Sequence, residues 1–288
     1  MTRSHAVLLM ILVTLLWSLA GIVSRQLESA ASFEVTFWRS SFNAITLCVF
    51  LSLLRGRGLW TTLRRSNRVI WLSGLCWAVM FTAFMIALTL TTVANVLIIM
   101  AFGPLLTALL ARIWLGSRLA PATGFAILVA GGGITGMFVH QITENISLAG
   151  SLIALAVPLA AAINWTLLQR QNARQDADPQ DMLPAVLIGA IISALGVLPF
   201  SYPFHATLHD LGWLAFLGAF QLALPCLLVV RITRTLAGSE IALLALLEVV
   251  FGVAWVWLGA GEQPSTATLA GGTLVIAALL ANELLPQT

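Results

Sequence analysis

Apolar runs long enough to cross a bilayer recur along almost the whole chain. About 20 consecutive apolar residues span the hydrocarbon core of a membrane. Of the 288 residues, 60% are hydrophobic and only 9% are charged, whereas soluble domains carry about 25% charged residues. Membrane segments must satisfy their own backbone hydrogen bonds, as helices or as a closed barrel. These runs are too uniformly apolar for the alternating strands of a barrel, so we expect an all-α integral membrane protein.

The spacing of the apolar runs predicts ten transmembrane helices joined by short connections. The expected spans lie at roughly 6–24, 33–54, 69–89, 93–115, 122–139, 148–168, 183–200, 211–230, 240–259 and 267–285. All 14 basic residues are Arg, and 12 of them fall at the N-terminus or after even-numbered spans, while only Arg25 and Arg39 fall near the other side. The positive-inside rule then predicts that both termini are cytoplasmic.

Short sequence matches indicate that the chain repeats itself. Trp17 and Trp165 are each followed by a hydroxyl residue, and Trp114 and Trp257 are each followed by Leu-Gly, at offsets of 148 and 143 residues. Each half then holds five spans, and because five is odd the second half enters the membrane from the opposite side. Such inverted repeats are typical of secondary transporters. The expected halves are residues 1–143 and 144–288.

The same features resemble the drug/metabolite transporter superfamily, in its EamA-like branch. The resemblance rests on the ten spans in two halves, on "FGPLLTALLARIWLGSR" in span four with Pro104 in its middle, and on "FWRSSFNA" at the start of span two. Span nine departs from the family pattern, because Glu248 stands near the place of a Pro and "LGAGEQ" replaces the usual turn. Overall the sequence looks most like the aromatic amino acid exporters of the YddG type. The resemblance implies an exporter of small metabolites with a central cavity between the halves.

Glu248 is the first candidate site residue, because it stands alone within "LLALLEVVFGVAW". A charged residue at the centre of a membrane helix costs about 2.5–3.5 kcal/mol on insertion scales. It is either a structural carboxylate bonded to a neighbouring helix or a cavity residue that meets a substrate amine or a proton; we favour the second. Leu244, Phe251, Gly252 and Trp255 would share its helical face.

Aromatic and amide side chains inside the spans supply the other candidates. Trp17 and Trp165 lie away from the interfacial belt where Trp usually gathers, and either packing or stacking on a flat substrate explains them. Trp77 and Phe81 share a face of span three and line either a cavity wall or the core, which we favour. The amides of Asn95, Asn164 and Gln221 need partners in the membrane. Of these, Asn95 and Gln221 are carried forward as substrate contacts, and Gln221 is preferred because it lies deepest.

Arg39 is expected to act as a structural charge or a gate. It lies about 9 Å into span two, and snorkelling to the outer surface is the default for such a residue. A substrate carboxylate and Glu262 are rival partners. We also expect Pro104, Pro158 and Pro225 to interrupt their spans, either as kinks that act as pivots or only by freeing a carbonyl. The glycines of spans five and ten are expected to allow close helix packing.

A carrier explains these features better than an enzyme or a scaffold. The chain has no HExxH, no phosphate-binding loop and no paired carboxylates within a span, so we expect neither catalysis nor a metal or other cofactor. The loops are too short for a large docking surface, and the basic residues form no nucleic-acid stripe. We therefore expect a multi-pass inner (plasma) membrane exporter, monomeric as the simplest case. It would move aromatic and other apolar amino acids by alternating access, or alternatively other small amphipathic solutes or drugs.

Overall fold

The protein is helical throughout the part of the chain that the structure describes. The computed structural model describes residues 1–24, 26–30, 32–56, 58–64, 66–91, 93–138, 147–173, 181–260 and 265–284. Its elements are α1 (Arg3–Ser24), α2 (Ser32–Arg55), α3 (Gly58–Arg64), α4 (Arg68–Leu90), α5 (Val93–Met100), α6 (Gly103–Leu115), α7 (Pro121–Phe138), α8 (Leu148–Ala173), α9 (Leu183–Ser201), α10 (Leu208–Phe216), the π-helix η2 (Leu217–Ala223), α11 (Leu224–Ile232), α12 (Gly238–Ala245), α13 (Leu247–Ala260) and α14 (Thr266–Leu284).

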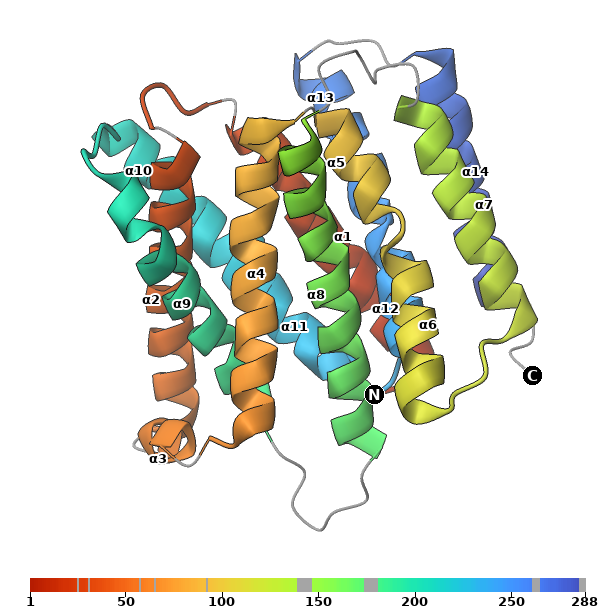
Figure 1. Cartoon of the computed structure of the whole chain (residues 1–288), viewed down its shortest axis with the longest axis horizontal. Coiled ribbons are helices and arrows are strands. Elements are labelled where there is room, and N and C mark those ends of the chain that lie inside the picture. Colours follow the sequence, from red (N-terminus) through yellow and green to blue (C-terminus); the bar gives the residue numbers. More distant parts are fainter. Residues whose placement is uncertain are drawn as a thin grey trace.

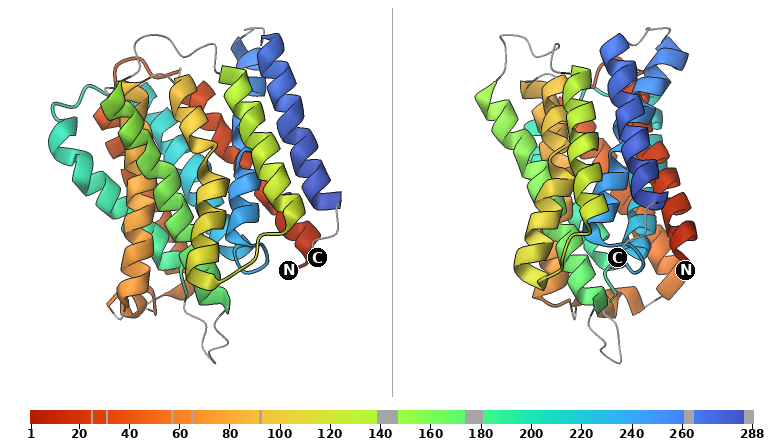
Figure 2. Two further views of the ribbon diagram at one scale, coloured as in Figure 1. Left: turned by 45° about the vertical axis from the view of Figure 1, so that its right-hand side comes forward. Right: turned by 90° about the vertical axis from the view of Figure 1, so that its right-hand side faces the viewer.

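The helices form one bundle whose members run mostly along a shared direction, with both chain termini at the same end (Figures 1 and 2). Within the described residues, eight helical stretches are long and apolar enough to cross a membrane. Two shorter apolar helices, Pro121–Met137 and Thr266–Asn282, lie beside them. The architecture is therefore that of a helical membrane protein. We refer below to the terminal end, which holds both termini, and to the opposite end.

Three of the expected spans are not uniform α-helices. Span four is divided into α5 and α6 by a turn at Ala101 and Phe102, and span nine is divided into α12 and α13 at Leu246. Span eight stays continuous but contains the π-helix η2 between α10 and α11. Pro104 lies in the first turn of α6, where its missing N–H has no partner to lose. These irregular segments leave backbone groups without their helical hydrogen bonds. Such breaks in membrane helices are frequent at functional sites.

Pro158 does not end its helix, and of the two expected readings the freed carbonyl describes it. Pro158 lies inside α8, which continues unbroken from Leu148 to Ala173. A membrane helix tolerates an internal Pro where its neighbours and local adjustment satisfy the freed carbonyl. Pro225, in contrast, lies in the first turn of α11, directly after the π-helix.

The bundle is held by pairs of helices from the two halves of the sequence. The helix α2 packs along α9, α7 packs along α14, and α4 packs along both α8 and α9. The helix α1 packs against α13 and α11, and α6 packs against α8 and α12. Most of the extensive interfaces thus join residues far apart in the chain, and the middle of the bundle lies between the two sequence halves.

Small residues set the closest of these approaches. A Cβ added to Gly74 of α4 would lie 2.7 Å from Ile188 of α9, and one added to Gly189 would lie 2.8 Å from the Gly74 carbonyl oxygen. Between α7 and α14, a Cβ on Gly133 would lie 2.8 Å from the Gly271 carbonyl oxygen. The expected packing role is confirmed for Gly133 and Gly271, because only a hydrogen at Cα allows such backbone contact.

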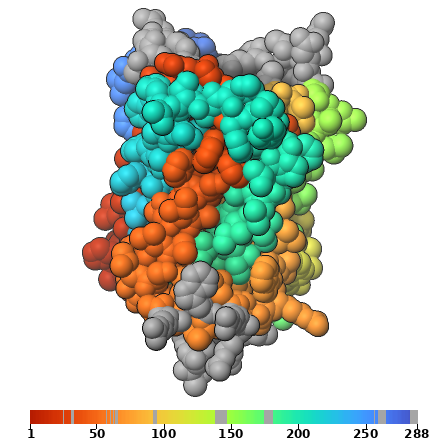
Figure 3. Space-filling view, turned by 90° about the vertical axis from the view of Figure 1, so that its left-hand side faces the viewer, coloured from red at the N-terminus to blue at the C-terminus, as the bar shows by residue number. Residues whose placement is uncertain are grey.

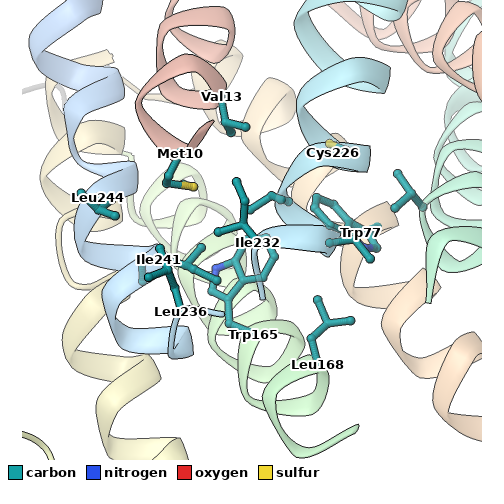
Figure 4. Packing of buried hydrophobic residues seen from close by; sticks show 14 of the residues in the cluster. Met10, Val13, Trp77, Trp165, Leu168, Cys226, Ile232, Leu236, Ile241 and Leu244 are labelled. Atoms are coloured by element: carbon teal, nitrogen blue, oxygen red, sulfur yellow. The ribbon is translucent and has the colours of Figure 1, made fainter. Parts of the chain in front are cut away.

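A dense apolar core fills the bundle on the side of the terminal end. Figure 4 shows Met10 of α1, Trp77 of α4, Trp165 of α8 and Ile241 of α12 in this core. All four are buried. Together they close the space between both sequence halves with apolar side chains.

Two buried carboxylates tie the halves together at the opposite end. Glu34 of α2 accepts hydrogen bonds from the backbone N–H of His205 (2.9 Å) and of Ala206 (2.8 Å). Asp210 of α10 accepts hydrogen bonds from the backbone N–H of Glu28 (2.8 Å) and of Ser29 (3.2 Å). Figure 3 shows this region, with α10 (teal) lying over the end of α2 (orange-red). Glu34 thus holds the loop before Asp210, and Asp210 holds the loop before Glu34.

Candidate functional site

A buried polar cluster lies where α2, η2 and α13 meet α1 and α4. The Arg39 side chain is only 3% exposed, and its Nη2 donates a 3.2 Å hydrogen bond to the carbonyl oxygen of Phe81. The Arg39 guanidinium also interacts electrostatically with Glu248, which is half-buried. Arg39 is therefore bonded to a backbone carbonyl of α4 and lies within electrostatic reach of the α13 carboxylate, without a direct ion pair to it. The expectation that Arg39 snorkels to the surface was wrong, because partners inside the bundle hold its charge.

Trp17 and Ser18 of α1 complete the cluster. The Trp17 carbonyl oxygen accepts a 3.1 Å hydrogen bond from Gln221 Nε2, and the Trp17 side chain lies next to the Cys226 side chain of α11. Ser18 Oγ accepts a 2.9 Å hydrogen bond from Nε1 of Trp255, which stands two turns beyond Glu248. Two adjacent residues of α1 thus fix this helix to η2, α11 and α13.

The glycine at position 218 explains why η2 can lie directly against α2 at Arg39. A Cβ there would lie 2.7 Å from the Arg39 carbonyl oxygen, 2.7 Å from the Asn43 backbone nitrogen and 2.6 Å from Phe42 Cβ. The backbones of η2 and α2 are therefore in direct contact. Because the π-helix widens the turn locally, it moves Gln221 relative to the register of an α-helix.

Several polar atoms of this cluster have no hydrogen-bond partner within the described residues. They are Arg39 Nε, both polar atoms of the Asn43 amide, and Gln221 Oε1. Asn43 is completely buried and Gln221 is 3% exposed. A buried polar group without a partner costs about 1–3 kcal/mol, and a native fold keeps such groups where they have a further role. This cluster is therefore the best candidate for a binding site in the bundle.

Asn43 is a candidate that sequence reasoning missed. It lies four residues after Arg39, so both side chains project from the same face of α2. That spacing was the available signal, but "FWRSSFNAITLC" also contains two serines that fit a polar helix face equally well. Only the approach of η2 identifies which face is buried.

Glu248 lies on a helix end and not in the middle of a helix as expected. It is the second residue of α13, directly after the break at Leu246. A carboxylate near a helix N-terminus is stabilised by the unpaired N–H groups and the helix dipole. The break also places Leu244 on α12, so the mixed face that we expected retains Phe251, Gly252 and Trp255.

The aromatic candidates form a continuous row beside the polar cluster. The ring centroids of Trp77 and Phe81 are 5.6 Å apart, and those of Trp77 and Trp165 are 5.4 Å apart in an edge-to-face arrangement. All three side chains are at most 4% exposed, and they belong to the core of Figure 4. Trp17, in contrast, is half-buried. The row therefore acts mainly as a packed wall, and Trp17 is the accessible ring.

Asn95 does not join the other predicted site residues. Its Nδ2 donates a hydrogen bond to Thr91 Oγ1 (3.1 Å) at the end of α4, and another to Ser151 Oγ (2.8 Å), which joins α5 to α8. Asn95 thus forms hydrogen bonds between helices and does not lie with the expected substrate contacts. Asn164 likewise accepts a 2.6 Å hydrogen bond from Ser73 between α8 and α4. Glu262, the rival partner of Arg39, lies outside the described residues.

Comparison with known proteins identifies the family. The model of the EamA-like transporter family matches residues 4–139 and 148–282, which is nearly the whole chain. The chain belongs to the EamA-like transporter family. It is therefore a multi-pass membrane transporter, as the sequence resemblance implied at the level of the family.

Named relatives of this EamA-like transporter are distant. It is 23% identical over 276 residues to the pseudopaline exporter CntI of Pseudomonas aeruginosa, in strain UCBPP-PA14 and also in strain PAO1. Each alignment covers 96% of this chain and 94% of the relative. A solved crystal structure of a protein shares the fold with a TM-score of 0.79 at 19% identity, covering 98% of both chains. Neither comparison points to the YddG type in particular.

A separate cavity of about 160 Å³ lies at the break in span four of this EamA-like transporter. Its lining comes from α6, α7 and the turn between α5 and α6, and includes Phe102, Leu105, Leu128 and Thr135. It shares no residue with the polar cluster, and several of its apolar side chains are exposed on the outside of the bundle. We therefore assign it to the surface that faces lipid and base the site on the polar cluster.

Proposed function

We propose that this protein is a secondary transporter that exports small metabolites across the inner membrane, with aromatic and other apolar amino acids as the preferred class. The observation that carries the proposal is the buried cluster of Arg39, Gln221 and Glu248, in which Arg39 Nε and Gln221 Oε1 have no hydrogen-bond partner within the described residues. Small-molecule sites are mostly apolar with a few convergent polar groups. The half-buried ring of Trp17 suits a flat substrate.

The arrangement of the helices supports a mechanism by alternating access. We infer ten spans in two inverted repeats, because helices that pack together in the bundle have counterparts in the other half of the chain that also pack together. For example, α1 packs on α11 as α8 packs on α4, and α2 packs on α9. The interrupted spans four and nine also occupy corresponding places in the two halves. In inverted-repeat transporters the substrate site lies at such interrupted helices, and the halves rock around it.

The alternative substrates are other small amphipathic solutes. The curated relatives are pseudopaline exporters, so a solute of that kind is the second candidate. The charges of the cluster suit it as well as they suit an amino acid, because both Arg39 and Glu248 offer partners to polar solutes. The aromatic surroundings favour the amino acids.

The experiment is uptake of labelled solutes into proteoliposomes that contain the purified protein. We expect saturable uptake of tryptophan and phenylalanine that exceeds uptake of glutamate and lysine. Liposomes with an inserted Arg39→Gln, Glu248→Gln double variant are the control for leak. Uptake of no amino acid by correctly inserted protein, together with uptake of another solute class, would contradict the proposed preference.

A further inference from the structure

We propose that Arg39 and Glu248 read the two ends of a zwitterion, with Arg39 binding the carboxylate and Glu248 binding the ammonium group of one molecule. The inference rests on the proposed function and deepens it, because it names the group that every substrate of the site shares. It also assigns the residues that set this specificity.

The first observation is that the two opposite charges are neighbours without being partners. Arg39 and Glu248 interact electrostatically, yet no nitrogen of Arg39 lies within the 4.0 Å of a direct ion pair with a carboxylate oxygen of Glu248. Arg39 uses one donor on the Phe81 carbonyl oxygen, and the Glu248 residue is half-buried. Two charges placed so can each receive a further, oppositely charged group.

The second observation is how the unpartnered atoms are distributed. Arg39 Nε is a free donor on α2, Gln221 Oε1 is a free acceptor on η2, and the buried Asn43 amide offers both a donor and an acceptor. A carboxylate only accepts hydrogen bonds, and an ammonium group only donates them. The cluster therefore carries both free donors and free acceptors together with its two opposite charges, as the head group of an α-amino acid requires.

The third argument is charge balance. A lone anion at Arg39 would be repelled by Glu248, and a lone cation at Glu248 would be repelled by Arg39. A zwitterion satisfies both charges, because a single carbon separates its ammonium group from its carboxylate. An analogue that lacks one of these groups leaves one buried charge of the protein without its partner. Such truncations weaken binding by roughly 30-fold or more.

Trp17 completes the assignment by placing the rest of the molecule. Its carbonyl oxygen holds Gln221 Nε2, which leaves Gln221 Oε1 for the ligand, and its half-buried ring lies on α1 beside these groups. The head group is thereby read by charge, and the side chain of the ligand meets an aromatic surface that accepts several apolar shapes. The site discriminates by head group first.

The test measures binding to purified, full-length protein by competition against labelled tryptophan. The competitors are tryptophan itself, tryptamine, which lacks the carboxylate, and 3-indolepropionate, which lacks the ammonium group. In the wild type we expect both analogues to bind at least about 30-fold more weakly than tryptophan. Arg39→Gln should abolish discrimination against tryptamine and keep discrimination against 3-indolepropionate, and Glu248→Gln should do the reverse.

Matched controls separate charge recognition from general damage. Arg112→Gln and Glu28→Gln remove an exposed guanidinium and an exposed carboxylate outside the cluster, and both should bind like the wild type. Arg39→Lys keeps the charge and should keep most of the discrimination against tryptamine. If a Gln variant fails to fold, the wild-type ratios among the three compounds still decide the matter.

The outcomes distinguish this inference from the proposed function. Wild-type protein that binds all three compounds equally, or variants that change both ratios alike, would overturn the zwitterion assignment even if tryptophan is transported. Selective binding of tryptophan without uptake into proteoliposomes would support the assignment and refute the transport function. Protein that neither binds nor transports any apolar amino acid would overturn both.

Discussion

Gly218→Ala should destabilise the protein strongly although it adds a single methyl group. The new Cβ would lie 2.6 Å from Phe42 Cβ and 2.7 Å from two backbone atoms of α2, the Arg39 oxygen and the Asn43 nitrogen. Real Cβ atoms do not approach so closely, and backbone atoms cannot turn away as a flexible side chain can. The helices must separate, and overpacking of this kind costs about 1–3 kcal/mol. We expect the upper part of that range.

Gly196→Ala is the matched control. A Cβ at this position in α9 meets nothing within 4 Å, so the substitution should gain about 0.5–1 kcal/mol from helix propensity alone. One kcal/mol shifts the Tm of a chain this large by about 2–4 °C. Thermal unfolding in detergent should therefore show Gly218→Ala lowered by roughly 5–10 °C and Gly196→Ala slightly raised. Equal Tm values for both variants would refute the close packing of η2 on α2.

The remaining predictions concern topology, the aromatic row and structural polar groups. Thr61→Cys, in α3 at the terminal end, should resist an impermeant thiol reagent added outside intact cells, because the distribution of arginines predicts that this loop is cytoplasmic; labelling from outside would contradict the predicted topology. Trp17→Ala should weaken tryptophan uptake roughly 2- to 10-fold more than leucine uptake in proteoliposomes, through loss of ring contact, and equal losses would indicate packing. Trp165→Ala should instead lower stability by about 3–5 kcal/mol in thermal unfolding, as for a buried core ring, while an unchanged Tm would remove Trp165 from the core. Asn95→Ala should lower the Tm without changing the affinity for tryptophan, whereas a weakened affinity would return Asn95 to the site.

Much of the fold is predictable from the sequence because a bilayer leaves few choices. A run of about 20 apolar residues can satisfy its backbone in a membrane only as a helix, and the apolar runs of this chain become helices in the described residues. Of the two breaks in spans four and nine, only the one in span four was expected, as an interruption at Pro104. The structure shows a break before Pro104 and a second one before Glu248, where no Pro marks it. Backbone breaks of that kind depend on packing against other helices, which a local sequence does not report.

The sequence predicted most residues of the candidate site but not how they are arranged. Arg39, Gln221 and Glu248 were recognisable because polar side chains are expensive in a membrane and need a reason. The direction that Arg39 takes was not recognisable, since the same long side chain can snorkel outward or reach a carbonyl inside the bundle. Asn43 was missed for a related reason, because its burial follows from the contact between α2 and η2. Gly218 makes that contact possible, and a lone glycine in an apolar run carries no sign of it.

The central claim is that the cluster around Arg39 and Glu248 is the place where substrate binds during transport. Glu248→Gln tests it most directly, because the amide keeps the shape and much of the hydrogen bonding of the carboxylate while it removes the charge. The measurement is the initial rate of tryptophan uptake into proteoliposomes at equal amounts of inserted protein. We predict a rate at least about 10-fold below the wild type, which corresponds to the loss of one charged contact of about 1.4 kcal/mol or more. A wild-type rate in well-inserted Glu248→Gln protein would contradict the claim.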